Sequence, residues 1–210
     1  MIKPYYQDKW VTIYHGDCRE VLPQLDVKMD LVLTDPPWNK DAQILYEFLG
    51  NNIDKFIKDD GYCALYAGSN FIQSVLNSFS HSELHYQWTF VVLQLSSDLR
   101  YFKYKIHSRW RPIMVFGKNN SSTKWSPDVI KSIRKKQLHE WQEGEESSLA
   151  LIEKYSDVDG LILDPFLGSG TTCFCAKKLN RYSIGIEIEE KYCEIAARRC
   201  SQEVMDFSKL

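Results

Sequence analysis

The chain has 210 residues, 44% of them hydrophobic and 26% charged, with a formal net charge of −2 at pH 7. Its length and hydrophobic content suffice to bury one core, so we expect a single domain over residues 1–210. No apolar run approaches membrane-spanning length and the start at Met1 lacks the apolar stretch of a signal peptide, which argues against a membrane protein and predicts a cytoplasmic one.

The first part of the chain predicts two strands that each end at an acidic residue. Residues 11–15 predict a short strand followed by Gly16 and Asp17, and residues 18–25 predict an amphipathic helix. Residues 31–34 form an apolar run that predicts a second strand, which Asp35 closes. A plain Gly-Asp turn is one interpretation of Asp17.

The tetrapeptide Asp35-Pro36-Pro37-Trp38 places a carboxylate, a stiff turn and an aromatic face at one strand end. The lone pair of an exocyclic amine on a nucleobase is delocalised into the ring, so the amine attacks an electrophile only when acceptors draw its hydrogens out of the ring plane. Asp35 supplies one acceptor. The carbonyl of Pro36 supplies a second, because consecutive prolines hold the backbone extended. Trp38 would stack on the base. The alternative interpretation is a strand stopped by a proline turn.

The middle of the chain predicts the alternating helices and strands that an α/β sheet requires. Helices are expected over residues 42–57 and 71–79, and strands over residues 62–66, 86–95 and 110–116. The last two strands predict an antiparallel pair within an otherwise parallel sheet.

The connection between that pair carries basic and aromatic residues. Its basic members are Arg100, Lys103, Lys105, His107, Arg109 and Arg111, and its aromatic members are Tyr101, Phe102, Tyr104 and Trp110. Basic groups hold phosphates and aromatic rings stack on bases, so the cluster offsets a net charge that is unfavourable for binding DNA. We expect residues 96–140 to form a DNA-contacting insertion, with a second basic set at Lys131 and residues 134–136. A solvated surface is the alternative.

Residues 119–128 are polar and predict a mobile loop or linker, after which residues 148–155 predict a helix. Residues 161–172 then read as a strand, a glycine turn and a helix start, and residues 182–187 as a further strand ending in Glu187. Gly168 and Gly170 allow close approach of the backbone to a ligand, and Glu187 suits a grip on two ribose hydroxyls. The turn is not a full G-x-G-x-x-G, which favours a nucleoside without phosphates, such as S-adenosylmethionine.

The cysteines predict buried thiols and no metal site, because they show no paired C-x-x-C spacing. They are Cys18, Cys63, Cys173, Cys175, Cys193 and Cys200. Cys173 and Cys175 are two residues apart on an expected helix, and therefore on different faces.

Both motifs together resemble the DNA amino-methyltransferases, whose signatures are D/S-P-P-Y/W/F and D-P-F-x-G-S-G-T. Residues 35–38 match the first and residues 164–171 the second. The catalytic motif precedes the cofactor loop, as in the circularly permuted beta group of adenine-N6 and cytosine-N4 methyltransferases. The resemblance covers about residues 10–200 and implies a Rossmann-like methyltransferase fold, S-adenosylmethionine as cofactor and double-stranded DNA as partner. Dimers are common among the relatives, so a homodimer is an expected assembly.

The resemblance also assigns roles to residues. Asp35, Pro36, Pro37 and Trp38 are the expected catalytic residues. The expected cofactor-binding residues are Asp17, Asp164, Phe166, Gly168, Ser169, Gly170, Thr171 and Glu187, with Asp17 facing the adenine, Asp164 and Phe166 contacting the methionine moiety and adenosine, and Thr171 binding the carboxylate. Ser169 and Thr172 are alternatively helix caps. Only His139 and Gln142 match the family segment that covers the methionine end, because its Lys-Pro is replaced by Glu143-Gly144.

The expected reaction is direct methyl transfer to the N6 amine of an adenine that is flipped out of duplex DNA. Arg100, Lys103, Lys105, Arg109 and Arg111 are the expected DNA-binding residues. Asp35, rather than Ser, favours adenine over cytosine-N4. An RNA or protein amine methyltransferase and an inactive cofactor- or DNA-binding module are the remaining alternatives. The expected methyl transfer requires the ends of the two motif strands to meet at one edge of the sheet.

Overall fold

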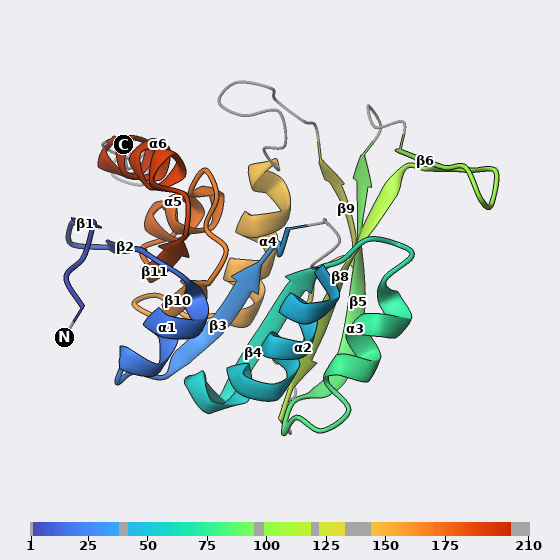
Figure 1. Cartoon of the computed structure of the whole chain (residues 1–210), viewed down its shortest axis with the longest axis horizontal. Helices are drawn as coiled ribbons and strands as arrows, with labels where there is room; N and C mark the ends of the chain where they lie inside the picture. The colour runs from blue at the N-terminus through green and yellow to red at the C-terminus, as the bar shows by residue number, and fades with distance from the viewer. Residues whose placement is uncertain (1, 38–41, 95–98, 119–121, 133–143, 203–210) are drawn as a thin grey trace.

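The structure is a computed structural model, which describes residues 2–37, 42–94, 99–118, 122–132 and 144–202. In this part of the chain one large sheet forms the centre of the molecule, with the strand order β1-β2-β11-β10-β3-β4-β8-β5-β9 (Figure 1). Its strands are β1 (Tyr6–Gln7), β2 (Val11–His15), β3 (Met29–Thr34), β4 (Ile57–Tyr66), β5 (His85–Gln94), β8 (Trp110–Gly117), β9 (Val129–Ser132), β10 (Leu161–Asp164) and β11 (Tyr182–Glu187).

The sheet is mostly parallel, as predicted. β2, β11, β10, β3 and β4 are successive parallel neighbours, whereas β8 pairs antiparallel with both β4 and β5. The expected antiparallel pair is therefore confirmed as β5 and β8. In the register of β3 and β10, Leu31 lies opposite Ile162 and Val32 opposite Leu163. The strands that carry the two motifs are thus direct neighbours, although they are far apart in the chain.

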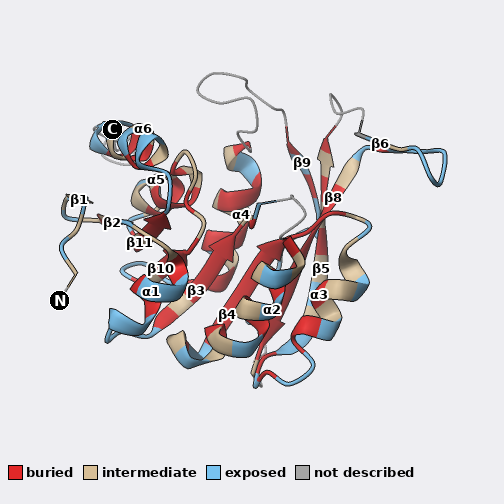
Figure 2. Ribbon diagram, viewed as in Figure 1, coloured by how far each residue is buried: buried red, intermediate tan, exposed pale blue. Residues whose placement is uncertain are grey.

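Helices cover both faces of the sheet. On one face are α1 (Cys18–Val21), α2 (Ala42–Asn52) and α3 (Ile72–Ser78), and on the other are α4 (Glu145–Tyr155), α5 (Thr171–Lys178) and α6 (Glu190–Ser201). β3 serves both faces, because Val32 packs with the first set while Leu31 and Leu33 pack against α4 and α5. Figure 2 shows the strands buried between the two layers. None of the helices in the described ranges has the length and apolar character to cross a membrane.

The helix predicted over residues 42–57 is shorter than expected. α2 ends at Asn52, a 3₁₀ turn (η2, Ile53–Phe56) follows, and Ile57 already begins β4 opposite Met29. Ile53 and Ile57 are both buried, and their spacing of four residues imitates a helix. A second 3₁₀ turn, η1 (Leu22–Gln24), likewise takes up the end of the helix predicted over residues 18–25.

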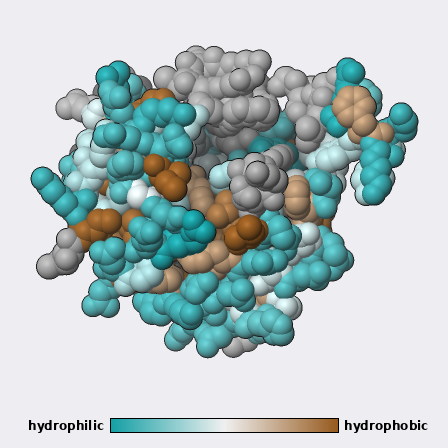
Figure 3. Space-filling view, in the orientation of Figure 1, coloured by the Kyte–Doolittle hydropathy of each residue, from teal (hydrophilic) through white to brown (hydrophobic). Residues whose placement is uncertain are grey.

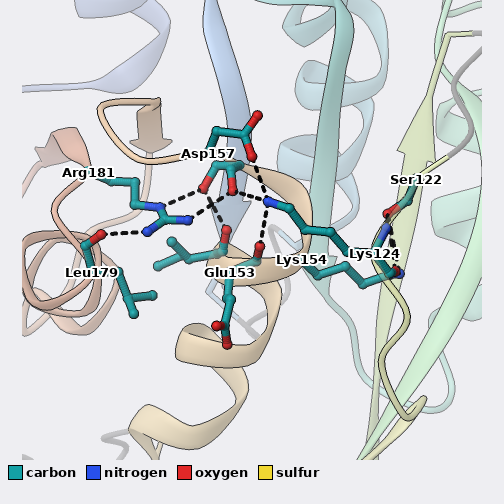
Figure 4. Close-up of polar contacts among 9 residues, drawn as sticks. Ser122, Lys124, Glu153, Lys154, Asp157, Leu179 and Arg181 are labelled. Atoms are coloured by element: carbon teal, nitrogen blue, oxygen red, sulfur yellow. Dashed lines mark hydrogen bonds and ion pairs between the residues drawn. The ribbon is translucent and has the colours of Figure 1, made fainter.

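The polar segment predicted to be mobile is anchored where the structure describes it. The Nζ of Lys124 donates hydrogen bonds to the carbonyl oxygens of Glu153, at 3.0 Å, and Ser156, at 2.8 Å, and to Oδ1 of Asp157, at 2.8 Å (Figure 4). An ammonium group satisfies carbonyls at the C-terminal end of a helix, here α4. Lys154 donates in return to the carbonyl of Lys124. Residues 122–128 form neither helix nor strand, which agrees with the loop prediction, and Lys124 anchors them to the end of α4; their mobility stays a prediction.

All six cysteines are buried, as predicted. Cys173 packs in one cluster with Cys193 and Cys200 on α6, whereas Cys175 packs in another with residues of α4, so the prediction of different faces is also confirmed. Burial raises the pKa of the Cys63 thiol to about 12. These thiols act as small apolar core residues.

Candidate active site

The two motifs meet at one edge of the sheet and are joined by side-chain hydrogen bonds. Thr34, which directly precedes Asp35, donates from Oγ1 to Oδ1 of Asp164 over 2.8 Å. Thr172 donates from Oγ1 to the carbonyl of Leu33 over 3.5 Å. The convergence expected from parallel strand ends is therefore confirmed, and it includes direct contacts between the segments.

Asp164 is the buried centre of this junction. Its oxygen Oδ1 also accepts the backbone N–H of Phe166, at 3.1 Å, and the residue is 4% exposed. Burial raises the pKa of Asp164 to about 6, and the hydrogen bonds from Thr34 and Phe166 oppose that rise. The carboxyl group thus holds the start of the cofactor loop against the catalytic strand. Its contact with a methionine moiety stays a prediction.

Glycine is favoured at positions 168 and 170 of the loop for different structural reasons. Both have positive φ, 53° for Gly168 and 81° for Gly170. A Cβ at Gly170 would lie 2.9 Å from Cβ of Ala196, so this glycine permits close packing on α6. A Cβ at Gly168 would meet no atom within 4 Å. Gly168 therefore leaves open space beside the backbone, which suits the approach of a ligand.

Glu187 is oriented toward the loop by two backbone donors. Its Oε2 accepts the N–H of Gly168 at 2.8 Å, and its Oε1 accepts the N–H of Glu189 at 2.9 Å. An ionised carboxylate can accept about four hydrogen bonds, so the arrangement is compatible with the predicted grip on ribose hydroxyls.

Asp17 lies next to Glu187, because Gly16 donates its N–H to the carbonyl of Glu187 over 2.9 Å. The carboxylate of Asp17 is the N-cap of α1 and accepts the N–H of Arg19 at 2.9 Å. Hydrogen bonding to the Arg19 side chain lowers the pKa of Asp17. Asp17 therefore forms the turn after β2 and caps α1, and its contact with the cofactor adenine stays a prediction.

The remaining loop residues have mixed outcomes. The N-cap of α5 is Gly170 and it has no side-chain cap, so the alternative that Ser169 or Thr172 caps this helix is wrong. The Oγ1 of Thr171 accepts from Nη1 of the buried Arg199 at 2.9 Å. Phe166 is partly buried against the core on the side of α1–α3. Binding of cofactor by Phe166, Ser169 and Thr171 stays a prediction.

On the catalytic side, the side chain of Asp35 is 30% exposed, Pro36 is buried and Pro37 is exposed. Trp38, His139 and Gln142 lie outside the described residues. The Nη2 of Arg111 lies 3.6 Å from Oδ2 of Asp35, and the side chain of Arg111 is only 9% exposed.

Arg111 is therefore placed beside the catalytic motif, apart from the exposed basic residues with which the sequence grouped it. Its position inside the strand predicted over residues 110–116 was the available signal for its burial.

The exposed basic residues lie on a projecting hairpin. β6 (Leu99–Tyr101) and β7 (Ile106–Ser108) form an antiparallel ribbon that stands away from the body at the upper right of Figure 1. Figure 3 shows an apolar group among hydrophilic residues there. Phe102, Tyr104 and Ile106 are 74%, 59% and 54% exposed. Also exposed are Arg100, Lys103, Lys105, His107 and Arg109.

The hairpin follows β5, which runs parallel to β3, so it leaves the sheet at the same edge as Asp35. The predicted insertion at 96–140 also includes β8 and β9, which do not project from the body because they are strands of the central sheet. Of the second basic set, Lys131 is exposed on β9, and residues 134–136 lie outside the described ranges.

Comparison with known proteins identifies relatives of this chain. The family described as "DNA methylase" (N6_N4_Mtase) matches residues 98–198. The type II methyltransferase M.ScaI of Streptomyces caespitosus is 28% identical over 265 aligned residues, which cover 96% of this chain and 84% of that protein. The type II methyltransferase M.HinfI of Haemophilus influenzae is 26% identical and covers 95% of this chain and 70% of its own length.

Solved structures share the fold. The M1.HpyAVI–SAM complex aligns with a TM-score of 0.75 and 22% identity, covering 91% of this chain and all of that one. The PvuII DNA methyltransferase, described as cytosine-N4-specific, aligns with a TM-score of 0.83 and 18% identity, covering 99% of this chain and 92% of that one. The predicted α/β methyltransferase fold is therefore confirmed. Residues 98–198 thus match the N6/N4 DNA methylase family, and over most of its length the chain is similar to type II DNA methyltransferases.

Proposed function

We propose that this chain transfers a methyl group from S-adenosylmethionine to the exocyclic N6 amine of adenine in double-stranded DNA, acting on a base flipped out of the helix. The observation that carries the proposal is the junction of the two motifs, in which Thr34 and Asp164 hold the catalytic strand against the cofactor loop. An acceptor for an amine and a loop suited to a nucleoside thereby lie at one edge of one sheet.

The residues present fit the cofactor. Gly168 leaves open space beside the loop, and the carboxylate of Glu187 is preoriented next to it. When bound there, S-adenosylmethionine supplies a methyl group whose bond to sulfur breaks as its bond to N6 forms. The protein contributes alignment and acceptors for the amine hydrogens rather than a covalent intermediate.

Asp35 is the proposed acceptor and the proposed receiver of the proton that N6 loses. A carboxylate that accepts a hydrogen bond from the amine turns the nitrogen lone pair out of the ring plane, toward the methyl carbon. Its partial exposure, 30%, is consistent with a group that faces an incoming base. The carbonyl of Pro36 is proposed as the second acceptor, and Trp38 as the stacking partner.

The hairpin of β6 and β7 is the proposed DNA contact, which narrows the predicted insertion to residues 99–109. Its exposed cations can neutralise phosphates, while Phe102 and Tyr104 project away from the core and can contact bases. Flipping a base requires that the duplex be held beside the catalytic edge, and the hairpin leaves the sheet there.

Transfer to the N4 amine of cytosine is the second candidate, because a structure described as cytosine-N4-specific shares the fold. Asp35 can polarise either amine, since both are exocyclic amines conjugated to a ring. Asp rather than Ser at this position favours adenine.

The test is incubation of the protein with S-adenosylmethionine carrying a labelled methyl group and, in parallel, genomic duplex DNA, RNA and protein. Hydrolysis to nucleosides and mass spectrometry should detect N6-methyladenine from DNA. Detection of N4-methylcytosine alone would show that cytosine, and not adenine, is the target base. Label found only in RNA or only in protein would refute DNA as the substrate. The Asp35→Asn variant should lose transfer while retaining cofactor binding by calorimetry. Loss of cofactor binding in that variant would contradict the assigned division of roles.

A further inference from the structure

The basic residue beside Asp35 suggests a role that the proposed reaction does not yet include. Arg111 is the second residue of β8, opposite Val92 of β5, and its side chain reaches past β4 toward the turn after β3. The distance of 3.6 Å between Nη2 of Arg111 and Oδ2 of Asp35 is that of an ion pair and exceeds a normal N–H···O hydrogen bond. The guanidinium therefore acts on the carboxylate mainly through its charge.

Burial separates Arg111 from the residues that suit contact with DNA phosphates. Arg111 is 7% exposed, whereas Arg109, two residues earlier in the chain, is exposed. A phosphate on the outside of a duplex is reached by exposed side chains such as those of the hairpin. A buried guanidinium requires a partner of opposite charge, and the Asp35 carboxylate is in place.

Among the described residues, three further titratable groups interact with the charge of Asp35, and none of them is a cation. They are Tyr46 on α2, Tyr66 on β4 and Asp164 on β10. Burial, and to a lesser extent the charge of Asp35, raises the pKa of Tyr46, and burial raises the pKa of Tyr66 to about 12. Both phenols are thus neutral near pH 7, and Asp164 is a second carboxyl group in the same region.

Arg111 also lies near an aromatic ring. Its Cζ lies 6.0 Å from the centre of the Tyr66 ring, at the outer limit of a cation–π contact. The hydroxyl of Tyr66 in turn donates to Oγ of Ser147 over 2.7 Å, at the start of α4. The planar guanidinium is thereby positioned between an aromatic ring and the catalytic carboxylate.

We propose that Arg111 is a positioning residue that keeps Asp35 ionised and directs its second oxygen toward the target amine. Oδ2 is held by the guanidinium, and Oδ1 is the oxygen that accepts from N6. This inference rests on the proposed function of Asp35. It adds a residue that lies outside the two motifs, residues 35–38 and 164–171.

The test compares Arg111→Met and Arg111→Lys with the unaltered enzyme. At saturating DNA and cofactor, Arg111→Met should lower kcat at pH 7 by about 100-fold, as removal of one electrostatic contact to a reacting group does. The acid limb of its pH–rate profile should move up by about one pH unit or more, since a nearby cation favours the carboxylate by that much. In Arg111→Lys, both the decrease in kcat and the shift of the acid limb should be smaller than in Arg111→Met. The affinity for S-adenosylmethionine should change less than about threefold.

A double variant separates this role from a general loss of structure. In an Asp35→Asn background the guanidinium has no carboxylate to hold, so adding Arg111→Met should lower the residual kcat far less than it does in the unaltered enzyme. Circular dichroism and cofactor binding report whether each variant folds. An equal loss in both backgrounds would overturn the proposal.

Arg109→Met provides the matched control for a phosphate contact. Replacement of this exposed arginine should raise KM for DNA and lower the salt dependence of binding, with the acid limb unmoved. If Arg111→Met behaves in the same way, Arg111 is a DNA contact and the proposal fails.

A titration without turnover distinguishes failure of this proposal from failure of the proposed function. Protein labelled with ¹³C at aspartate carboxyls, with the Asp35 signal assigned by Asp35→Asn, should show a higher pKa for Asp35 in Arg111→Met than in the unaltered chain. The comparison is valid whether or not DNA proves to be the substrate. An unchanged titration of Asp35 would refute the coupling to Arg111.

Discussion

At the scale of single residues, Asp164 shows how this site combines packing with charge. The carboxyl is buried at the junction of two strands and accepts hydrogen bonds from Thr34 and from the backbone of Phe166. These donors favour the ionised form, but burial outweighs them and raises the pKa to about 6. The ionised group therefore joins the motifs at a cost in stability near neutral pH.

The raised pKa of Asp164 determines the sign of the resulting pH dependence. A carboxyl group that titrates near 3.8 in the unfolded chain and near 6 in the folded one favours folding most below pH 3.8. This contribution declines as the pH rises and is lost above 6. For a fully buried group the difference of about two pH units corresponds to roughly 3 kcal/mol.

Asp164→Asn should remove this dependence, because the amide oxygen can still accept from Thr34 and Phe166. The unfolding free energy of the variant relative to the unaltered chain should rise by up to about 3 kcal/mol between pH 4 and pH 7. Urea denaturation at several pH values measures it, and the common background of other titrating groups cancels in the difference. A difference that does not vary with pH would contradict the assignment.

At the scale of elements, the hairpin of β6 and β7 and the loop around Lys124 show opposite uses of lysine. Lys124 is held by carbonyls at the end of α4, whereas Lys103 and Lys105 stand on a ribbon with little packing around it. The φ of 55° at Lys105 marks the tight turn that closes this ribbon. The charge of Lys124 anchors a loop, whereas the charges of Lys103 and Lys105 are available to a binding partner.

Replacing Arg100, Lys103, Lys105 and Arg109 by Gln should weaken binding of duplex DNA and flatten its salt dependence. Removal of each phosphate-binding charge lowers the slope of log affinity against log salt by about 0.9, so a decrease of about 2 to 4 is expected. Fluorescence anisotropy at several salt concentrations measures the slope.

The control is Lys28→Gln with Lys55→Gln, exposed residues at the opposite ends of the strands. An equal change of slope in both variants would show that the hairpin does not bind the duplex.

Much of this architecture could be predicted from local sequence, and the reason differs between elements. β3 and β10 contain short apolar runs that end at an aspartate, so their existence and the meeting of the two motifs at one edge of the sheet were predictable. The end of α2 was not, because Ile57 continues the helical spacing.

The pairing of Arg111 with Asp35 could not be predicted, because it depends on β8 lying between β4 and β5. Nothing local in the sequence specifies that order of strands. The predicted strand over residues 110–116 could indicate that Arg111 is buried, but not which acidic residue lies beside it.

At the scale of the whole molecule, one sheet carries both halves of the proposed site. The cofactor half is built on β2, β11 and β10, and the half that receives the base on β3, β4 and β8. No boundary between domains separates them in the described part of the chain. Cofactor binding should therefore stabilise the entire fold rather than one lobe.

Addition of S-adenosylmethionine at 100 times its Kd should raise the unfolding free energy by about 2.7 kcal/mol in the unaltered chain and in Asp35→Asn. Glu187→Gln should lose most of this gain, because its amide cannot accept from two ribose hydroxyls as a carboxylate can. Thermal and urea unfolding measure the effect. Stabilisation of Glu187→Gln equal to that of the unaltered chain would remove Glu187 from the cofactor site.

The direction of β8 has a consequence for how substrate arrival and chemistry are linked. Because this strand runs against its neighbours, it enters the sheet where they leave it, and Arg111 follows soon after the hairpin ends at Ser108. We therefore expect that DNA bound to the ribbon contacts the chain only a few residues away from the arginine proposed to hold Asp35.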